Sequence, residues 1–463
     1  MRRILQYKYH FLIFIFSFFL LSKFSVDPDL GWHMAIGEHF LRTGEVIKAD
    51  TFSWTMPGYM WGNSYFVYQI IVAILINYLG LMTTGLLFGL LGAFGVVLMM
   101  PRRLNLLTFL VVCLGVVIAR SNLAIRPHMI SFFMFSLMLV LLKKGFYLSF
   151  KSFVFWILFF LTWANFHNGF LIGLGFFGLF VAIEKLTNYK RDKRGLRRFL
   201  ILAALLFMAT LVTPFGLRLW QSVIGDAFYL NMYFSIAEWL SIVFFFPENV
   251  IFLVSALIFI FFWFVNFKKV PVAWMLLSAM FFTLPFLGVY FDFFWAAAFI
   301  FMVANFFPIK AKFEGDLMAL FPVYIGITAA FLVAGLSFYL SVVTGSTLTA
   351  AFVEGGYPAG AVAFMEKNGP YKNIYNDYAW GGFIDWQYPE QKVFMDGRMT
   401  GWRNAGGGYI FRDYLEIAKG NDCSLLDKYG VRSALVRNVS DWSCDSKFKE
   451  VYRDKLSRVL VRD

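Results

Sequence analysis

The chain has 463 residues, of which 60% are hydrophobic, 21% are aromatic and only 15% are charged. This apolar share is well above that of ordinary soluble domains and predicts a membrane protein that crosses the bilayer many times. The formal net charge of +13 does not indicate nucleic-acid binding. The basic residues lie mostly in short loops between apolar segments, where they orient a membrane protein.

Apolar stretches long enough to span a bilayer recur from the N-terminus to Val343. Because positively charged loops stay cytoplasmic, residues 64–79 are predicted to lie at the interface instead of crossing. The sequence then predicts a mainly α fold, a polytopic bundle of about eleven transmembrane helices, at residues 9–25, 83–100, 104–120, 128–143, 152–164, 168–185, 198–213, 250–267, 271–288, 292–307 and 318–343. The first segment lacks a small-residue cleavage site and is predicted to be a retained anchor.

Polar and charged residues return in normal proportion from residue 344. We therefore predict a transmembrane domain at 1–343, whose first outer loop is 26–82, and a soluble α/β domain at 344–463. The N-terminus is expected in the cytoplasm and the C-terminal domain outside a plasma (inner) membrane. Within this domain the pattern predicts helices at 358–367 and 409–418, and strands at 373–375, 392–395, 433–436, 447–452 and 458–461. Cys423 and Cys444 pair if this domain faces an oxidising compartment.

Two acidic residues follow the first apolar stretch directly, in the sequence Asp27, Pro28, Asp29. A charge at mid-membrane costs about 2.5 to 3.5 kcal/mol, so acids tolerated near hydrocarbon usually contact water, a cation or a polar ligand. Asp27 and Asp29 are candidate catalytic carboxylates and possible ligands of a divalent cation, Mg or Mn. The alternative is a solvated connector in which Pro28 stops the helix. We expect Asp29 to cap an interfacial helix, Leu30 to Leu41, that Gly44 ends.

Further polar residues gather on the predicted outer face. Glu238 is a candidate acid, and the alternative is a solvated neighbour of an interfacial Trp. Arg126 and Arg218 suit phosphate binding because the guanidinium fork matches phosphate oxygens, although Arg126 also fits a snorkelling side chain. The other candidate substrate-binding residues are Trp32, His33, Asp50, His128, Asn165, His167 and Trp239. His33 and Glu38 are five positions apart and do not form an i, i+4 metal pair, so no zinc site is predicted.

Two loops of the C-terminal domain follow predicted strands, where α/β domains tend to bind ligands. They are residues 376–382, which contain Trp380, and the turn Asp396, Gly397, Arg398. Trp380, Asp396 and Arg398 are therefore candidate substrate-binding residues, and the alternative is that both loops are ordinary turns. No glycine-rich dinucleotide or P-loop nucleotide motif is present.

These residues together resemble a group of bacterial polytopic proteins related to the GT-C glycosyltransferases. The resemblance covers nearly the whole chain. It rests on Asp27, Pro28, Asp29, Gly31, Trp32, His33, Gly37, Asp50, Thr51, Phe52, Ser53, Pro57, Gly58 and Trp61, with Trp163, Asn165, His167, Gly169, Pro214, Phe215, Gly216, Glu238, Trp239, Trp380, Gly381, Gly382, Asp396, Gly397 and Arg398. The order of parts is also loosely similar to oligosaccharyltransferase catalytic subunits, but residues 376–382 depart from their WWDYG motif. A Glu-Trp pair that the group tends to have near Tyr65 and Phe66 is absent here.

The resemblance implies a GT-C-like fold and transfer of a sugar from a polyprenyl-phosphate-type donor to an extracytoplasmic glycan, lipid or protein. Asp27 or Asp29 would be the base, or a metal or acceptor ligand, and membrane lipids would surround the bundle. One competing hypothesis is a transporter or flippase for a lipid-linked or charged solute, which favours ionisable residues deep within spans and internal repeats. The charged residues lie mostly at span ends, which favours the enzyme. A third hypothesis is an assembly or scaffold protein.

Overall fold

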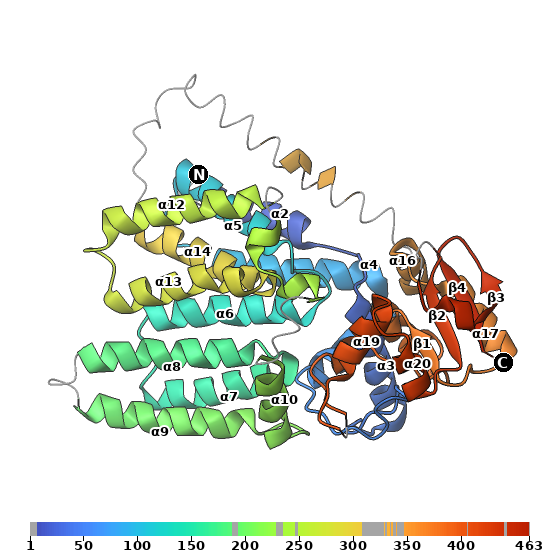
Figure 1. Cartoon of the computed structure of the whole chain (residues 1–463). Helices are drawn as coiled ribbons and strands as arrows, with labels where there is room; N and C mark the ends of the chain where they lie inside the picture. Colours follow the sequence, from blue (N-terminus) through green and yellow to red (C-terminus); the bar gives the residue numbers. More distant parts are fainter. Residues whose placement is uncertain are drawn as a thin grey trace. The chain divides into compact units, whose positions relative to one another are not determined.

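The structure is a computed structural model that describes residues 7–187, 193–227, 235–245, 249–307, 347–404, 406–438 and 442–462, with a few positions between 328 and 339 (Figure 1). Its contacts divide the chain into two compact units. The helical unit contains residues 1–24, 83–213 and 233–343, and the α/β unit contains residues 25–82, 214–232 and 344–463. Each unit is described by itself.

The helical unit is a bundle of apolar helices, several of which run side by side in Figure 1. Its α-helices are α2 (Lys8–Leu21), the second part of α4 (Phe66–Leu98), α5 (Leu106–Ala119), α6 (Pro127–Lys143), α7 (Phe150–Phe166), α8 (Phe170–Thr187), α9 (Lys193–Thr210), α12 (Val250–Asn266), α13 (Val272–Leu287) and α14 (Asp292–Phe306). Short 3-10 helices η1 (Ala237–Trp239), η2 (Ile242–Phe245) and η3 (Val289–Phe291) join them. Helix α14 forms the core, because every residue from Asp292 to Val303 is buried and α14 packs on α5, α6, α12 and α13.

By length and composition, three helical segments of the described residues can cross a membrane: Phe66–Leu98, Phe170–Thr187 and Val289–Phe306. Six further apolar helices, of 10 to 17 residues, are shorter. The prediction of a mainly α fold with apolar spans is confirmed, and ten of the expected spans coincide with helices. The expected span 318–343 lies mostly outside the described residues.

Helix α4 changes direction at Gly80, whose φ of 81° and ψ of 166° are not helical. Glycine adopts this backbone conformation without the steric cost that a side chain would bring. The boundary between the two units falls in the sequence just after this break, between Met82 and Thr83. The sequence predicts residues 64–79 and 83–100 as two segments, and the helix does break between them, at Gly80.

The α/β unit contains three segments that lie far apart in the sequence. Its helices are α3 (Pro28–Thr43), the first part of α4, α10 (Leu217–Ala227), α16 (Leu348–Glu354), α17 (Ala359–Asn368), α18 (Gly381–Gln387), α19 (Ile410–Ala418) and α20 (Ser424–Tyr429), with 3-10 turns η4 (Tyr378–Trp380), η5 (Gly397–Met399) and η6 (Asp445–Lys447). The strands are β1 (Ile374–Asn376), β2 (Ser433–Arg437), β3 (Lys449–Arg453) and β4 (Ser457–Val461). They form one sheet in the order β1-β2-β4-β3. Strand β1 runs parallel to β2, and the other two pairings are antiparallel.

The expectation of a strand at 392–395 is wrong. Val393 instead makes a single parallel bridge to Ser53, and its N–H donates to the Phe52 carbonyl at 3.0 Å. The Asn376 side chain accepts a hydrogen bond from the Phe394 N–H at 2.7 Å and donates one to the Met395 carbonyl at 2.9 Å. These polar groups are satisfied by a side chain and by the loop at residues 52–54, so the segment does not enter the sheet.

The first outer loop was expected to belong with the transmembrane domain, whereas the structure groups residues 25–82 with residues 344–463. Two further hydrogen bonds join these segments. The indole Nε1 of Trp54 donates to the Ile374 carbonyl at 2.9 Å, and Thr55 Oγ1 donates to the Phe394 carbonyl at 2.5 Å. Residues 50–61 are therefore part of a folded domain.

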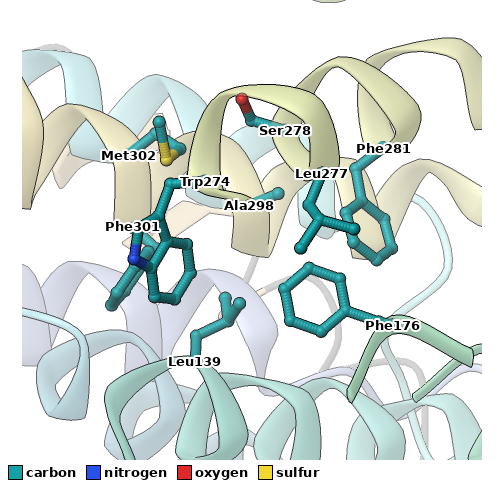
Figure 2. A pocket seen from close by; sticks show the side chains of 9 residues that line it. All are labelled: Leu139, Phe176, Trp274, Leu277, Ser278, Phe281, Ala298, Phe301 and Met302. Carbon is teal, nitrogen blue, oxygen red and sulfur yellow. The ribbon is translucent and has the colours of Figure 1, made fainter. Parts of the chain in front are cut away.

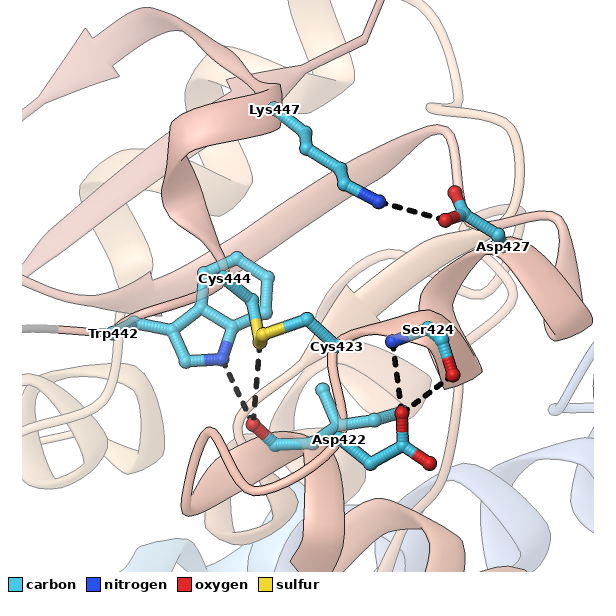
Figure 3. Close-up of a disulfide and its surroundings, with 8 residues drawn as sticks. Asp422, Cys423, Ser424, Asp427, Trp442, Cys444 and Lys447 are labelled. Carbon is cyan, nitrogen blue, oxygen red and sulfur yellow. Dashed lines mark hydrogen bonds and ion pairs between the residues drawn. A yellow bond between two sulfur atoms is a disulfide. The ribbon is translucent and has the colours of Figure 1, made fainter.

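Cys423 and Cys444 form a disulfide with a Cα–Cα distance of 5.5 Å (Figure 3). The Trp442 indole beside it donates to the Ile417 carbonyl at 3.1 Å, so the bridge is packed against α19. Cys113, the third cysteine, is buried and free. A paired cystine is typical of proteins that fold in an oxidising compartment.

Replacing both Cys423 and Cys444 with Ser is expected to destabilise the α/β unit by about 3 kcal/mol, because the bridge closes a loop with a sequence separation of 21. The measurement is the thermal unfolding of the purified full-length protein. Reductant added to the wild type should reproduce the shift and should leave the double variant unchanged. Equal melting temperatures for the oxidised wild type and the double variant would contradict this assignment.

Candidate functional site

The acidic loop folds into the beginning of helix α3. Helix α3 starts at Pro28, and Asp27 is its N-cap, accepting hydrogen bonds from the N–H of Asp29 at 2.8 Å and of Leu30 at 3.2 Å. The expectation that Asp29 caps the helix is therefore wrong by two residues. Proline favours the first helical position because its ring fixes the required φ. The predicted end of the helix at Gly44 is confirmed, with φ of 73°.

Asp27 and Asp29 are half-buried and lie at the positive end of the α3 dipole, which favours negative charge. The Trp32 indole donates to Asp29 Oδ1 at 2.9 Å. Trp32 itself is 3% exposed and so acts as a support for Asp29 within the folded unit. Of the two carboxylates, Asp27 holds the helix cap and Asp29 accepts a side-chain donor.

Asp50, Asp396 and Arg398, which the sequence predicted separately, form one buried ion cluster. Arg398 Nη2 lies 2.9 Å from Asp50 Oδ1 and 2.5 Å from Asp396 Oδ2, and its Nε donates to Asp396 Oδ1 at 2.8 Å. The guanidinium packs over the rings of Phe52 and Trp402, with its Cζ at 4.8 Å and 5.4 Å from the centroids. A buried Arg needs such partners, because an unpaired charge in a protein interior is very costly.

Asp385, in α18, adds a third acid to this cluster and was not predicted. Burial, together with the carboxylates of Asp396 and Asp50, raises the pKa of Asp385 well above its usual value. Burial alone would lower the pKa of the Arg398 guanidinium, but the carboxylates of Asp396 and Asp50 outweigh it and raise that pKa. The raised pKa favours the protonated form of Asp385, and the Arg398 charge faces the carboxylates of Asp50 and Asp396.

The remaining predicted residues of the α/β unit lie in different surroundings. His33 is buried between the rings of Tyr65 and Tyr68, and its Nδ1 lies 3.2 Å from the Gln69 amide. Trp380 is 1% exposed, and its indole donates to the Gly356 carbonyl at 3.1 Å. Arg218 is exposed on α10.

In the helical unit, three cations lie close enough to interact electrostatically. They are Lys23, Arg120 and Arg126, and Lys23 donates to the Arg120 carbonyl. Burial, with Arg120 and Arg126, lowers the pKa of Lys23 to about 7, although Asp292 acts in the opposite direction. Lys23 was expected inside the first span, but α2 ends at Leu21, so the lysine follows the helix. We call Lys23, Arg120 and Arg126 the cation cluster.

Arg126 precedes α6 and forms an ion pair with Glu238 at 2.6 Å. The side chain of Arg126 is 11% exposed and that of Glu238 is 37% exposed. The two residues were predicted separately, and the structure brings them together. Asp292 accepts hydrogen bonds from Ser121 and, at 2.6 Å, from Asn122, so the chain that leads into Arg126 is anchored.

Tyr290 links most of the predicted aromatic and histidine residues of the helical unit. Trp239 stacks on its ring at 4.6 Å, and its hydroxyl donates to Asn168 Oδ1 at 2.8 Å. The ring of His128 lies 4.8 Å from that of Tyr290 and 4.6 Å from that of His167. Sequence reasoning missed Tyr290 because a tyrosine beside an apolar segment is common at membrane interfaces.

His167 is held as a neutral ring. The Gly169 N–H donates to its Nδ1 at 3.2 Å, while the Ser131 hydroxyl lies 2.6 Å from the same atom and receives the Trp163 indole N–H at 2.7 Å. Burial, with a contribution from Arg126, lowers the pKa of His167 to about 3. An imidazole of this pKa does not exchange protons near neutral pH, so His167 positions its neighbours.

The Asn165 amide donates to the Leu161 carbonyl at 2.9 Å and to the Val212 carbonyl at 3.0 Å. A small pocket in the same unit lies between α6, α8, α13 and α14 (Figure 2). Its only polar lining residue is Ser278, whose hydroxyl donates to the Met275 carbonyl at 2.9 Å. This pocket therefore offers an apolar surface and no reactive group.

The predicted site residues thus form two sets, one in each unit. Asp27, Asp29, Trp32, Asp50, Asp396 and Arg398 lie in the α/β unit, and Arg126, His128, His167, Glu238 and Trp239 lie in the helical unit. That both sets face one ligand stays a prediction. Among the described residues, no group of three or more His, Cys, Asp or Glu side chains has a geometry that could hold a metal ion.

No protein-family model matches the chain, and no curated protein matches it in sequence. Fifteen chains of solved structures match it in three dimensions. One of them is the crystal structure of ArnT from Cupriavidus metallidurans bound to undecaprenyl phosphate. It is 14% identical, and the match covers 99% of this chain and 97% of that chain with a TM-score of 0.48. A likeness of this degree does not assign the chain to a family.

Replacing Asp385 with Asn is expected to stabilise the protein increasingly as pH rises above about 4. The raised pKa of Asp385 means that the folded state keeps the proton while the unfolded state loses it, so wild-type stability falls with rising pH. The slope is at most about 1.4 kcal/mol per pH unit, and it ends at the folded-state pKa. The Asn side chain does not ionise, so the stability of the variant lacks this pH dependence.

The measurement is the melting temperature of both proteins from pH 4.5 to 8.5. Glu354→Gln, at an exposed position of the same unit, is the matched control. Its melting temperature should change with pH as that of the wild type does. A gap between Asp385→Asn and the wild type that stays constant with pH would show that Asp385 is ionised in the folded protein.

Proposed function

We propose that this chain is a multi-pass membrane glycosyltransferase of the GT-C type. It would move a sugar from a polyprenyl-phosphate-type donor to an extracytoplasmic glycan, lipid or protein. The observation that carries the proposal is the half-buried Asp27 and Asp29 at the first turn of α3, directly after the first apolar helix. Acidic residues this close in sequence to an apolar span usually contact water, a cation or a polar ligand.

Sugar transfer requires two kinds of group, and each unit supports one of them. A carboxylate must take the proton of the acceptor hydroxyl, which is the role proposed for Asp29. Positive charge must meet the phosphate that departs with the lipid, because negative charge grows there in the transition state. The cation cluster would supply that charge, and Arg126 suits a bidentate contact with phosphate oxygens.

The other predicted residues would assist these two. Asp27 would hold the first turn of α3 through its cap and, with Asp29, could bind a divalent cation. Glu238 would orient the Arg126 guanidinium or act as an acid beside Trp239, an aromatic surface of the kind that binds sugars. Arg218 is a second phosphate-binding candidate in the α/β unit. The disulfide between Cys423 and Cys444 supports an extracytoplasmic location for the α/β unit.

Replacing Asp29 with Asn is expected to lower the rate of sugar transfer by about 100-fold or more, because a general base contributes roughly 10² to 10⁴. The assay uses purified protein with polyprenyl-phosphate sugars, with and without Mg²⁺ or Mn²⁺. Glu45→Gln, at an exposed position after α3, is the matched control and should keep wild-type activity. If Mg²⁺ raises the transfer rate of the wild type but not of Asp27→Asn, a cation bound by Asp27 and Asp29 would be supported.

Two results would favour the competing hypotheses. Full transfer by Asp29→Asn would remove the proposed base. Cells that carry Asp29→Ala and keep normal surface glycans, but lose export of a solute, would indicate a transporter instead of an enzyme.

The cation cluster predicts a pH dependence for binding of polyprenyl phosphate. A bound phosphate favours protonated Lys23, whose pKa is lowered to about 7 in the free protein. Above that pH, binding must be accompanied by proton uptake, so the affinity should fall by up to about tenfold per pH unit. Lys23→Gln should bind more weakly at pH 7, by about 10-fold, and should lose this slope.

Lipid binding is measured between pH 7 and 9.5, where the phosphate itself stays ionised. Lys48→Gln, at an exposed position of the other unit, is the control and should keep the wild-type slope. The same slope in Lys23→Gln would place the titrating group elsewhere.

A further inference from the structure

The proposed chemistry gives no role to the two loops of the C-terminal region, residues 376–382 and 396–398. Both contact the beginning of α3. A Cβ added at Gly382 would lie 2.5 Å from the Pro28 carbonyl oxygen, and one added at Gly31 would lie 2.2 Å from the Gly382 oxygen. Atoms in proteins do not approach a Cβ this closely, so only glycine fits at both positions. Helices α3 and α18 are therefore in backbone contact beside Asp29.

The second loop contacts the Asp29 carboxylate itself. A Cβ added at Gly397 would lie 2.1 Å from Asp29 Oδ1 and 3.2 Å from Trp32 Nε1. The same Oδ1 accepts the Trp32 indole N–H at 2.9 Å. Gly397 and Trp32 therefore both lie against the same oxygen of the Asp29 carboxylate.

The position of Gly397 is fixed by its two neighbours in the chain. Asp396 Oδ1 accepts both the Arg398 backbone N–H at 2.9 Å and its Nε at 2.8 Å, which closes the turn on itself. Arg398 is then bound to Asp50 at 2.9 Å, and the side chains of both are fully buried. A salt bridge of this kind holds one geometry, because moving either charge would leave the other buried and unpaired.

We propose that Gly397, Arg398, Asp396 and Asp50 are positioning residues that hold the Asp29 carboxylate against Trp32. The catalytic role of Asp29 in this inference rests on the proposed function, whereas the position of its carboxylate does not. It gives the Asp396, Gly397, Arg398 turn a function without any contact to substrate. The aromatic rings over Arg398 exclude water from its ion pairs with Asp50 and Asp396, which strengthens them.

A thiol at position 29 tests the positioning without any enzyme assay. Cys113 is buried and the other two cysteines are paired, so the thiol of Asp29→Cys is the reactive one. Its rate of modification by a charged methanethiosulfonate is measured at one pH with chelator present. Adding Gly397→Ala should change the rate at least about threefold, because the new methyl group occupies space beside residue 29. Adding Asp50→Asn should also change it, because one partner of Arg398 is weakened.

The matched control is Gly225→Ala, which lies in α10 of the same unit where an added Cβ meets nothing within 4 Å. It should leave the thiol rate unchanged. Unchanged rates in both Gly397→Ala and Asp50→Asn would overturn the proposal.

With Asp29 intact, Gly397→Ala should lower kcat for sugar transfer by about 10-fold or more while KM for the donor stays within about twofold. A merely structural role would lower the amount of folded protein and leave kcat per folded molecule unchanged. Trp32→Phe, which keeps an aromatic ring but removes the indole N–H to Asp29, is the second variant if Gly397→Ala does not fold, and it should lower kcat in the same way. Wild-type protein without transfer activity would reject the proposed function, and the thiol rates would still decide the positioning.

Discussion

The α/β unit depends on a single buried guanidinium. Arg398 is enclosed by Asp50 and Asp396 and is covered by Phe52 and Trp402. Taking the partners away from such a buried charge typically costs 3 to 5 kcal/mol, roughly the size of a domain's whole margin of stability at its lower limit. Because Asp50 comes from the first outer loop and Arg398 from the C-terminal region, the ion pair requires both segments to fold together.

This requirement explains why the acidic loop has a defined shape. Residues 52–54 pair with Val393 through backbone hydrogen bonds, and Asn376 satisfies the backbone that a neighbouring strand would otherwise have paired. Glycines at positions 31, 382 and 397 then allow α3 to approach both loops at backbone distance. A loop that only connected two helices would need none of these contacts.

The sequence predicted what local patterns determine. Apolar runs located ten of the expected spans, the local residue pattern located β2 and β4, and Gly44 marked the end of α3, where its φ is 73°. It did not predict features that depend on distant residues. The segment 392–395 reads as a strand by composition, but its partners are Asn376 and Phe52, which no local pattern connects to it. Lys23 was assigned to a span because one charge does not interrupt a long apolar run.

Burial separates the predicted site residues into two physical kinds. Asp50, Asp396, Arg398 and His167 are buried, and each has protein partners at hydrogen-bond distance, so their bonding capacity serves the fold. Asp27, Asp29, Arg126 and Glu238 keep part of their surface open, although each also has a protein partner. Residue type alone does not distinguish these kinds, because Asp29 and Asp396 are the same amino acid in similar glycine-rich and aromatic surroundings. A substrate can compete only for the second kind, so in each unit the partly exposed residue, Asp29 or Arg126, is the one that a substrate can reach, and the buried cluster determines where Asp29 points.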